Sequence, residues 1–416
     1  MAERIAAGLF IACFVLLPFG RLVELPMFLA ALLGLGMLRH SPRPWRRWEL
    51  NLASLVFLGY WLPELFSALD AIDPRRSWGE VALDLRYLPM LWYFADRLRD
   101  AAVQRWVQNA LALIVGVWVL DALLQLATGW SLGGPGSPDR LSGIFGADHL
   151  KLGAMVAVLA AFLLNASLGR NTALGALAGL ATLAVVLLSG TRSAWIMLAI
   201  VLFGLVLARF GGRRALLSLL LASAIGSALG VIGYQTSERF AARIERSAAL
   251  FSGDREGLDH ALAFRLPIWE TALSMTQAHP LNGVGVRGFR VAYAEHAAED
   301  DRWIGFDGEH GAAHAHNIVL ELLSETGLLG LACWLLAIIG AWRGWRWADA
   351  ERRRLALAPG IALLAMLFPL NTHYAVYSSV WGGLLLLLAA LYVAAVLPQG
   401  RFARDAEGGS TGPTPR

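Results

Sequence analysis

The sequence predicts an all-α polytopic membrane protein with about twelve transmembrane helices. Of its 416 residues, 57% are hydrophobic and 16% are charged, and the mean hydropathy is +0.55. A soluble chain usually carries about 25% charged residues. Apolar stretches of bilayer-crossing length recur from the first residues to residue 397. The first stretch is therefore predicted to be a membrane helix and not a cleaved signal peptide.

Each predicted helix is an apolar stretch of roughly the 17–25 residues that a bilayer requires. In chain order the predicted helices cover residues 4–20, 22–38, 50–68, 80–96, 107–127, 149–168, 172–189, 193–209, 215–234, 317–341, 355–371 and 379–397.

Charge alternates along the connections between these helices. The basic set is RHSPRPWRRWE (39–49), DRLRDAAVQR (96–105), LGRN (168–171), RFGGRR (209–214) and WRGWRWADAERRR (342–354). Positively charged loops face the cytoplasm, so we expect both termini there, including a disordered tail at 398–416. The other connections then face the periplasm, or whatever compartment lies across the membrane.

One outward connection, residues 235–316, is far longer than an ordinary loop and is expected to contain structure or function. It separates predicted helices 1–9 (1–234) from helices 10–12 (317–397). SERFAARIERSAALF (237–251) predicts an amphipathic helix on the membrane surface, and a second helix carrying Arg265 is predicted at 261–278. Six of the nine histidines lie here: His260, His279, His296, His310, His314 and His316.

The end of this connection, HAHNIVLELLSETGLLG (314–330), places a histidine where a polar loop becomes a membrane helix. An imidazole at that boundary can exchange protons, although interfacial anchoring is the commoner role. Gly327 and Gly330 are predicted to share a helix face that lets a neighbouring helix approach closely.

Two arginines differ from the solvated majority. Arg192 lies in the tight turn SGTRSAW (189–195) between two apolar helices, where it either snorkels to the interface or binds an anion at a helix start. Arg265, in FRLPIW (264–269), either binds an anion or pairs with Glu270 on a surface helix.

Four motifs in this order resemble the O-antigen ligase and polymerase superfamily: SGTRSAW, FRLPIW, HPLNGVGVRGF (279–289) and His316-Asn-x9-Gly-xx-Gly. The last resembles the ligase branch. The resemblance covers about 189–330 and implies a membrane glycosyltransferase of the GT-C type. Such an enzyme transfers an O-antigen polysaccharide from undecaprenyl diphosphate to a lipid A–core oligosaccharide at the periplasmic face.

The resemblance implies roles for three residues. Arg192 and Arg265 would hold the diphosphate, and His316 would act as general base in a metal-independent inverting displacement. No cofactor and no nucleic acid partner are expected, and membrane lipids surround the protein. Further outward residues are expected to contact substrate or to support the loop: His314, Arg140, Arg287, Arg290 and His373.

Several alternatives remain open at this point. The spacing of His310, His314 and His316 also suits a metal site. An O-antigen polymerase or a protein O-oligosaccharyltransferase would use the same donor and architecture. A secondary transporter would explain twelve helices, but it would concentrate charges at the midplane, where the sequence has few beyond Asp84, Arg86 and Asp121.

Overall fold

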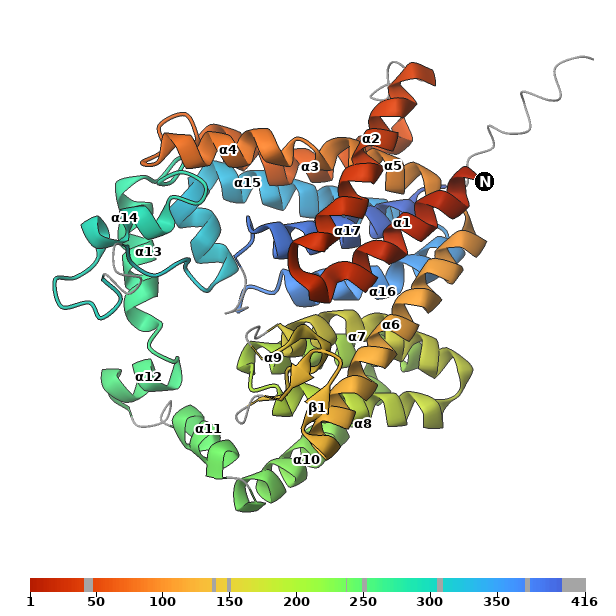
Figure 1. Cartoon of the computed structure of the whole chain (residues 1–416), viewed down its shortest axis with the longest axis vertical. Coiled ribbons are helices and arrows are strands. Elements are labelled where there is room, and N and C mark those ends of the chain that lie inside the picture. Colours follow the sequence, from red (N-terminus) through yellow and green to blue (C-terminus); the bar gives the residue numbers. More distant parts are fainter. Residues whose placement is uncertain are drawn as a thin grey trace, which may run out of the picture.

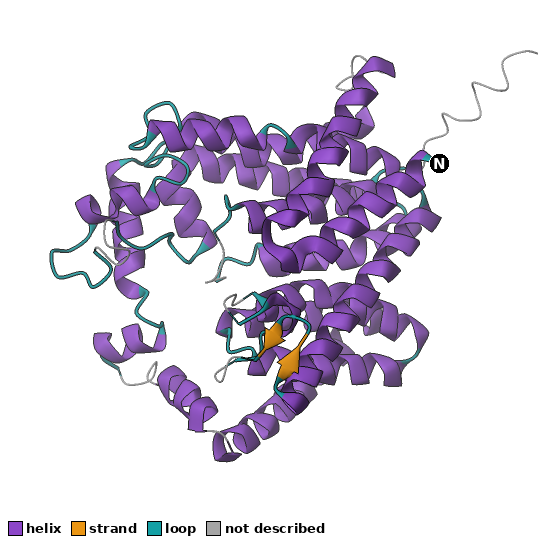
Figure 2. Ribbon diagram, viewed as in Figure 1, coloured by secondary structure: helices purple, strands orange, loops and turns teal. Residues whose placement is uncertain are grey.

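The computed structural model describes residues 1–40, 48–136, 140–147, 151–236, 238–248, 253–304, 310–370 and 375–398. The chain is built almost wholly of helices (Figures 1 and 2). The first half contains α1 (Ala2–Leu16), η1 (Leu17–Val23), α2 (Glu24–His40), α3 (Trp48–Ser67), α4 (Pro74–Asp84), α5 (Tyr87–Arg97), α6 (Ala101–Thr128), the hairpin of β1 (Trp130–Ser131) and β2 (Gly134–Pro135), η3 (Gly143–Phe145), α7 (Leu152–Arg170) and α8 (Thr172–Leu188). The second half contains α9 (Arg192–Phe210), α10 (Gly212–Thr236), α11 (Glu238–Ala248), α12 (Arg255–Ala261), α13 (Leu266–Ala278), α14 (Phe289–His296), α15 (Ile318–Trp347), α16 (Ala350–Met366) and α17 (Ser379–Val396).

The prediction of a polytopic membrane protein is confirmed, but twelve crossings remain a prediction. Within the described residues, 7 helical stretches are long and apolar enough to cross a membrane. One of them, Ala2–Arg39, includes both α1 and α2. These two helices are separated at Gly20, whose φ of 68° interrupts the helix.

The helix predicted at 80–96 is wrong as a single element, because the chain breaks between α4 and α5. Arg86 uses its own guanidinium to donate to the carbonyl of Leu83 at 2.8 Å. The buried Asp84 side chain accepts a hydrogen bond from the Tyr60 hydroxyl at 3.3 Å. Arg86 thus competes for a local backbone carbonyl, and Asp84 binds a different helix, where an otherwise apolar stretch is interrupted.

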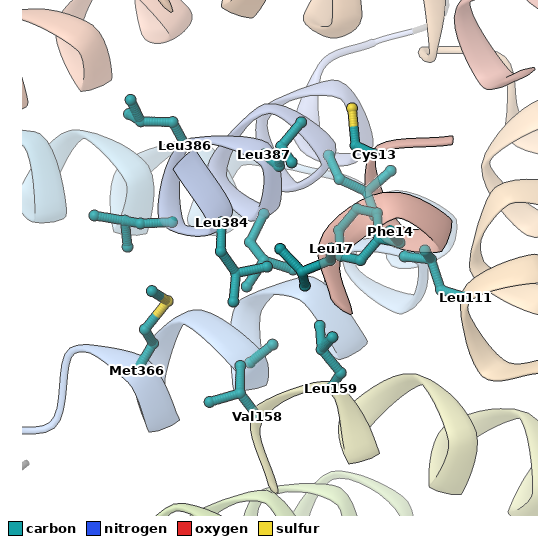
Figure 3. Close-up of a cluster of buried hydrophobic side chains, with 14 of the residues drawn as sticks. Cys13, Phe14, Leu17, Leu111, Val158, Leu159, Met366, Leu384, Leu386 and Leu387 are labelled. Atoms are coloured by element: carbon teal, nitrogen blue, oxygen red, sulfur yellow. The ribbon is translucent and has the colours of Figure 1, made fainter. Parts of the chain in front are cut away.

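The main core is centred on α17, where every residue from Trp381 to Val396 is buried. A helix that is apolar on all sides is suited to the middle of a bundle. Figure 3 shows side chains from α1, α6, α7 and α16 gathered around this helix. The first membrane helix and the last one thus share one core.

The large connection between α10 and α15 has a small core of its own. Residues from α13, α14 and the segment before α15 form it: Ile268, Ala272, Met275, Val284, Phe289, Ala292, Tyr293, Ala312 and Ala315. In Figure 1, α10, α11 and α12 follow one another along the edge of the molecule toward α13. The helix predicted in SERFAARIERSAALF is confirmed as α11. The helix predicted at 261–278 begins only at Leu266.

The charge alternation predicts that the segment before α15 and the start of α16 lie on opposite sides of the membrane. Ala313 and Ala350 are both exposed, so each accepts a cysteine without disturbing a core. In a variant with Cys13 and Cys333 replaced by alanine, an impermeant thiol reagent added outside should label Ala313→Cys and spare Ala350→Cys. Labelling only Ala350→Cys from outside would invert the topology.

Candidate functional site

The first candidate arginine, Arg192, begins α9 immediately after a tight turn. Gly190 in that turn has a φ of 74°, which glycine adopts without penalty. The Arg192 side chain is half-buried, and its guanidinium donates a hydrogen bond to the carbonyl of Ala261 at the end of α12. It therefore turns toward the large connection and does not simply extend to the membrane surface.

The second arginine, Arg265, is the last residue before α13 and not part of a helix interior as predicted. It follows Ala263 and Phe264, whose φ angles of 57° and 61° prevent the helix from starting earlier. The pairing with Glu270 that the sequence allowed is not formed. Glu270 instead accepts from Arg255 at 2.6 Å, on the exposed surface.

The two arginines lie close enough to influence each other electrostatically. Burial, and next the positive charge of Arg192, lower the pKa of the Arg265 guanidinium to about 10. Holding two like charges together in a half-buried place is unfavourable unless an anion joins them. Both residues also stand at helix starts, where the dipole and the unpaired N–H groups favour negative charge. This arrangement suits a phosphate or diphosphate.

His316 lies at the point where the loop turns into α15. Its φ of 51° is unusual for a residue other than glycine, and such conformations concentrate at functional sites. Its ring centroid lies 3.9 Å from that of His314. Asn317 then caps α15, accepting from the amides of Val319 and Leu320 at 3.0 and 3.1 Å. The His-Asn pair thus consists of a half-buried imidazole at the end of the loop, followed by the N-cap of α15.

The small core of the large connection links His316 to Arg265. Ala315, directly before His316, is fully buried in that core, as is Ile268 in the first turn of α13. Arg265 precedes Ile268 by three residues. His316 and Arg265 therefore both adjoin this small core, and Arg192 binds the end of α12, which precedes Arg265 in the chain.

The two glycines of the motif do not share a helix–helix contact face as predicted. Gly327 has a φ of 65° and kinks α15. At this kink the amides of Leu328 and Leu329 donate to the carbonyls of Pro280 and Leu281 at 2.9 and 3.0 Å. Gly330 does face α3, since an added Cβ would lie 3.3 Å from Pro63. The two glycines therefore have different roles: Gly327 forms a kink that binds a loop, and Gly330 allows the close approach of α3.

Gly327→Ala should lower the thermal stability of the protein. The positive φ alone costs a side-chain-bearing residue about 1–3 kcal/mol, and the new Cβ would collide with the Leu281–Asn282 backbone. Thermal unfolding of the purified variant measures the loss. Gly169→Ala in α7 is the control, because a Cβ there meets nothing within 4 Å. Equal melting temperatures for the two variants would contradict this role.

The other predicted contact residues have different surroundings. Arg140 lies beside the end of α8, where the Leu141 amide donates to the Leu188 carbonyl at 3.3 Å. Arg287 lies 3.6 Å from Glu80, so it serves an ion pair. Arg290 belongs to α14, and its carbonyl accepts from Gly311 at 3.3 Å. His373 lies outside the described residues.

Buried carboxylates around α15 were not anticipated from the sequence. Glu321 accepts from the Val376 amide at 2.8 Å, and Glu325 accepts from the Phe289 amide at 3.4 Å. Both are at most 2% exposed. The sequence does contain a signal for them, since two acids four residues apart in an apolar helix lie on one face and can be buried together. They fasten α15 to the two loops beside it.

The spacing of His310, His314 and His316 also allowed a metal site. In the part of the chain that the structure describes, no group of three His, Cys, Asp or Glu side chains is arranged to hold a metal ion. Asp307 and Glu309, which stand near these histidines in the sequence, lie outside the described residues. A metal-independent reaction stays a prediction.

Comparison with known proteins supports the motif analysis. Residues 176–335 match the family described as O-antigen ligase. No curated protein matches the chain. The matched segment contains Arg192, Arg265 and His316, and it runs from α8 into α15. The match over residues 176–335 supports the O-antigen ligase superfamily for this part of the chain.

Proposed function

We propose that the protein is an O-antigen ligase of the bacterial inner membrane. It would transfer a polysaccharide from undecaprenyl diphosphate to a sugar of lipid A–core at the periplasmic face. The observation that carries the proposal is the match of residues 176–335, which contain Arg192 and Arg265, to the O-antigen ligase family. A lipid diphosphate would relieve the repulsion between the two guanidinium groups, and it already carries the activation that the transfer requires.

In the proposed reaction, an acceptor hydroxyl attacks the anomeric carbon of the donor from the face opposite the diphosphate. The new glycosidic C–O bond forms as the bond from that carbon to the phosphate oxygen breaks. His316 takes the hydroxyl proton, and undecaprenyl diphosphate leaves with its charge held by the arginines. One displacement inverts the anomeric configuration. His314, beside His316, would orient the acceptor or the ring of the base.

Deleting the gene and examining lipopolysaccharide on a gel tests the proposal. A ligase predicts loss of the O-antigen ladder together with accumulation of lipid-linked polymer. An O-antigen polymerase predicts instead that a single repeat remains on the core. An intact ladder with loss of glycans from proteins would indicate a protein O-oligosaccharyltransferase. An unchanged lipopolysaccharide and glycoprotein profile would favour a transporter.

A further inference from the structure

The turn between α12 and α13 requires support from its surroundings. Ala263 and Phe264 both adopt left-handed conformations, with φ angles of 57° and 61°. Residues with a side chain rarely adopt this conformation once, and two in succession are rarer still. Such a turn persists only where neighbouring groups hold it. Arg265, one of the proposed diphosphate ligands, is the next residue.

Trp303 and Arg302 hold this turn from one side. The Trp303 indole Nε1–H donates to the carbonyl of Phe264 at 2.7 Å. The Arg302 guanidinium lies over the Phe264 ring, 3.9 Å from its centroid. The Phe264 carbonyl and the Arg265 amide belong to one planar peptide unit. Fixing that carbonyl therefore fixes the backbone from which the Arg265 side chain extends.

Asp301 connects the clamp formed by Arg302 and Trp303 to the small core of the large connection. One of its carboxylate oxygens accepts from the Trp303 amide at 2.8 Å, and the other accepts from the Tyr293 hydroxyl at 2.8 Å. Tyr293 is fully buried in that core. A continuous series of contacts thus runs from the packed core, through Asp301 and Trp303, to the residue before Arg265.

Asp259, in α12 just before the turn, binds the same turn through two hydrogen bonds. Its carbonyl accepts from the Phe264 amide at 2.7 Å, and its carboxylate accepts from the Leu266 amide at 3.0 Å. Arg192 contributes a further contact at Ala261. Trp303 and Asp259 thus hold the two peptide units on either side of Arg265, and Trp303 is the one of them that reaches the turn from a distant part of the chain.

We infer that Trp303 is a positioning residue that holds the left-handed Ala263–Phe264 turn, and with it Arg265, in the geometry that receives the donor diphosphate. The inference rests on the proposed function. Trp303 itself need not touch the substrate. Its loss would leave both guanidinium groups present but would let Arg265 depart from Arg192. Donor affinity, and not the chemical step, would then be affected.

Trp303→Phe tests the inference, because it keeps an aromatic side chain and removes the N–H donor. Loss of one neutral hydrogen bond predicts a dissociation constant for the donor lipid that is roughly 3- to 10-fold larger. The probe is undecaprenyl diphosphate without sugar, titrated into the purified protein by native mass spectrometry. The KM for lipid-linked polysaccharide should rise by the same factor, while kcat at saturating donor stays unchanged. Trp342→Phe, at the far end of α15, is the control and should match the wild type.

Ala263→Gly provides a rescue that a purely structural role would not predict. Glycine adopts positive φ without penalty, so the turn should form without the clamp. The double variant Trp303→Phe/Ala263→Gly should therefore recover most of the lost donor affinity. If Trp303→Phe does not accumulate in the membrane, Arg302→Gln replaces it, because the exposed Arg302 side chain can be changed without opening the core.

Two results would overturn the positioning role: donor affinity like that of Trp342→Phe, or a loss that appears in kcat and is not restored by Ala263→Gly. Failure of the proposed function looks different. In that case Arg192→Lys and Arg265→Lys would bind the diphosphate lipid as well as the wild type does. Impaired lysine variants together with normal Trp303→Phe would remove only the positioning role.

Discussion

Replacing His316 by alanine is expected to reduce polysaccharide transfer about 10²- to 10⁴-fold, the usual contribution of a general base. Alanine leaves no group to accept the proton of the attacking hydroxyl. The fold should survive, because His316 is only half-buried and Asn317 still caps α15. Initial rates with purified protein, lipid-linked donor and lipid A–core measure the effect.

His314→Ala is the matched variant, since the two rings stand 3.9 Å apart between centroids. It should lose much less activity than His316→Ala, and EDTA should affect neither the wild type nor this variant. Equal loss in both histidine variants, abolition by EDTA and rescue by a divalent ion would instead make the histidines metal ligands.

Arg192→Lys and Arg265→Lys should each be severely impaired, although the positive charge remains. An ammonium group cannot donate two parallel hydrogen bonds to a phosphate as guanidinium does. Losing one charge-assisted hydrogen bond predicts roughly a 10- to 150-fold decrease in kcat/KM. Steady-state rates at varied donor concentration measure it, with the amount of protein in the membrane as a check on insertion.

Arg255→Lys is the control for these two variants. Arg255 is close in the chain to Arg265, but its partner is the exposed Glu270. An exposed ion pair contributes only about 0–1 kcal/mol, so transfer should be nearly unchanged. Full activity of Arg192→Lys and Arg265→Lys would show that both arginines serve topology or packing.

Local sequence predicted the parts of this fold that depend on composition and short motifs. Runs of apolar residues predicted the membrane helices, and the apolar positions at helical spacing in SERFAARIERSAALF, with arginines between them, predicted α11. The motifs at 189–195, 264–269 and 316–330 predicted the family. In each case, a few neighbouring residues contain the physical signal: apolar length, helical spacing or a cap.

Contacts between distant segments could not be predicted in the same way. Arg192 and Arg265 influence each other across 73 positions of sequence, an effect that depends on the Arg192 side chain reaching the carbonyl of Ala261 at the end of α12. Nothing in the pair Ala263–Phe264 suggests two left-handed residues. Their conformation depends on Trp303 and Asp259, which lie on either side of them in the chain.

The Gly327 kink was misread for a related reason. Glycines three apart in an apolar stretch are typical of helix contacts in membranes. Here one of them instead serves the loop at Pro280–Leu281, which hydrogen-bonds to the opened helix. The break between α4 and α5 was missed because apolar length outweighed two polar side chains, Asp84 and Arg86, on either side of Leu85.

The central claim is that this protein itself moves a polysaccharide from a lipid diphosphate onto lipid A–core. The most direct test is a transfer assay with the purified protein in liposomes, supplied with lipid-linked O-antigen, lipid A–core and EDTA. We predict core-linked polysaccharide with inverted anomeric configuration and release of undecaprenyl diphosphate. Longer lipid-linked chains without any transfer to the core, or no consumption of the donor, would contradict the claim.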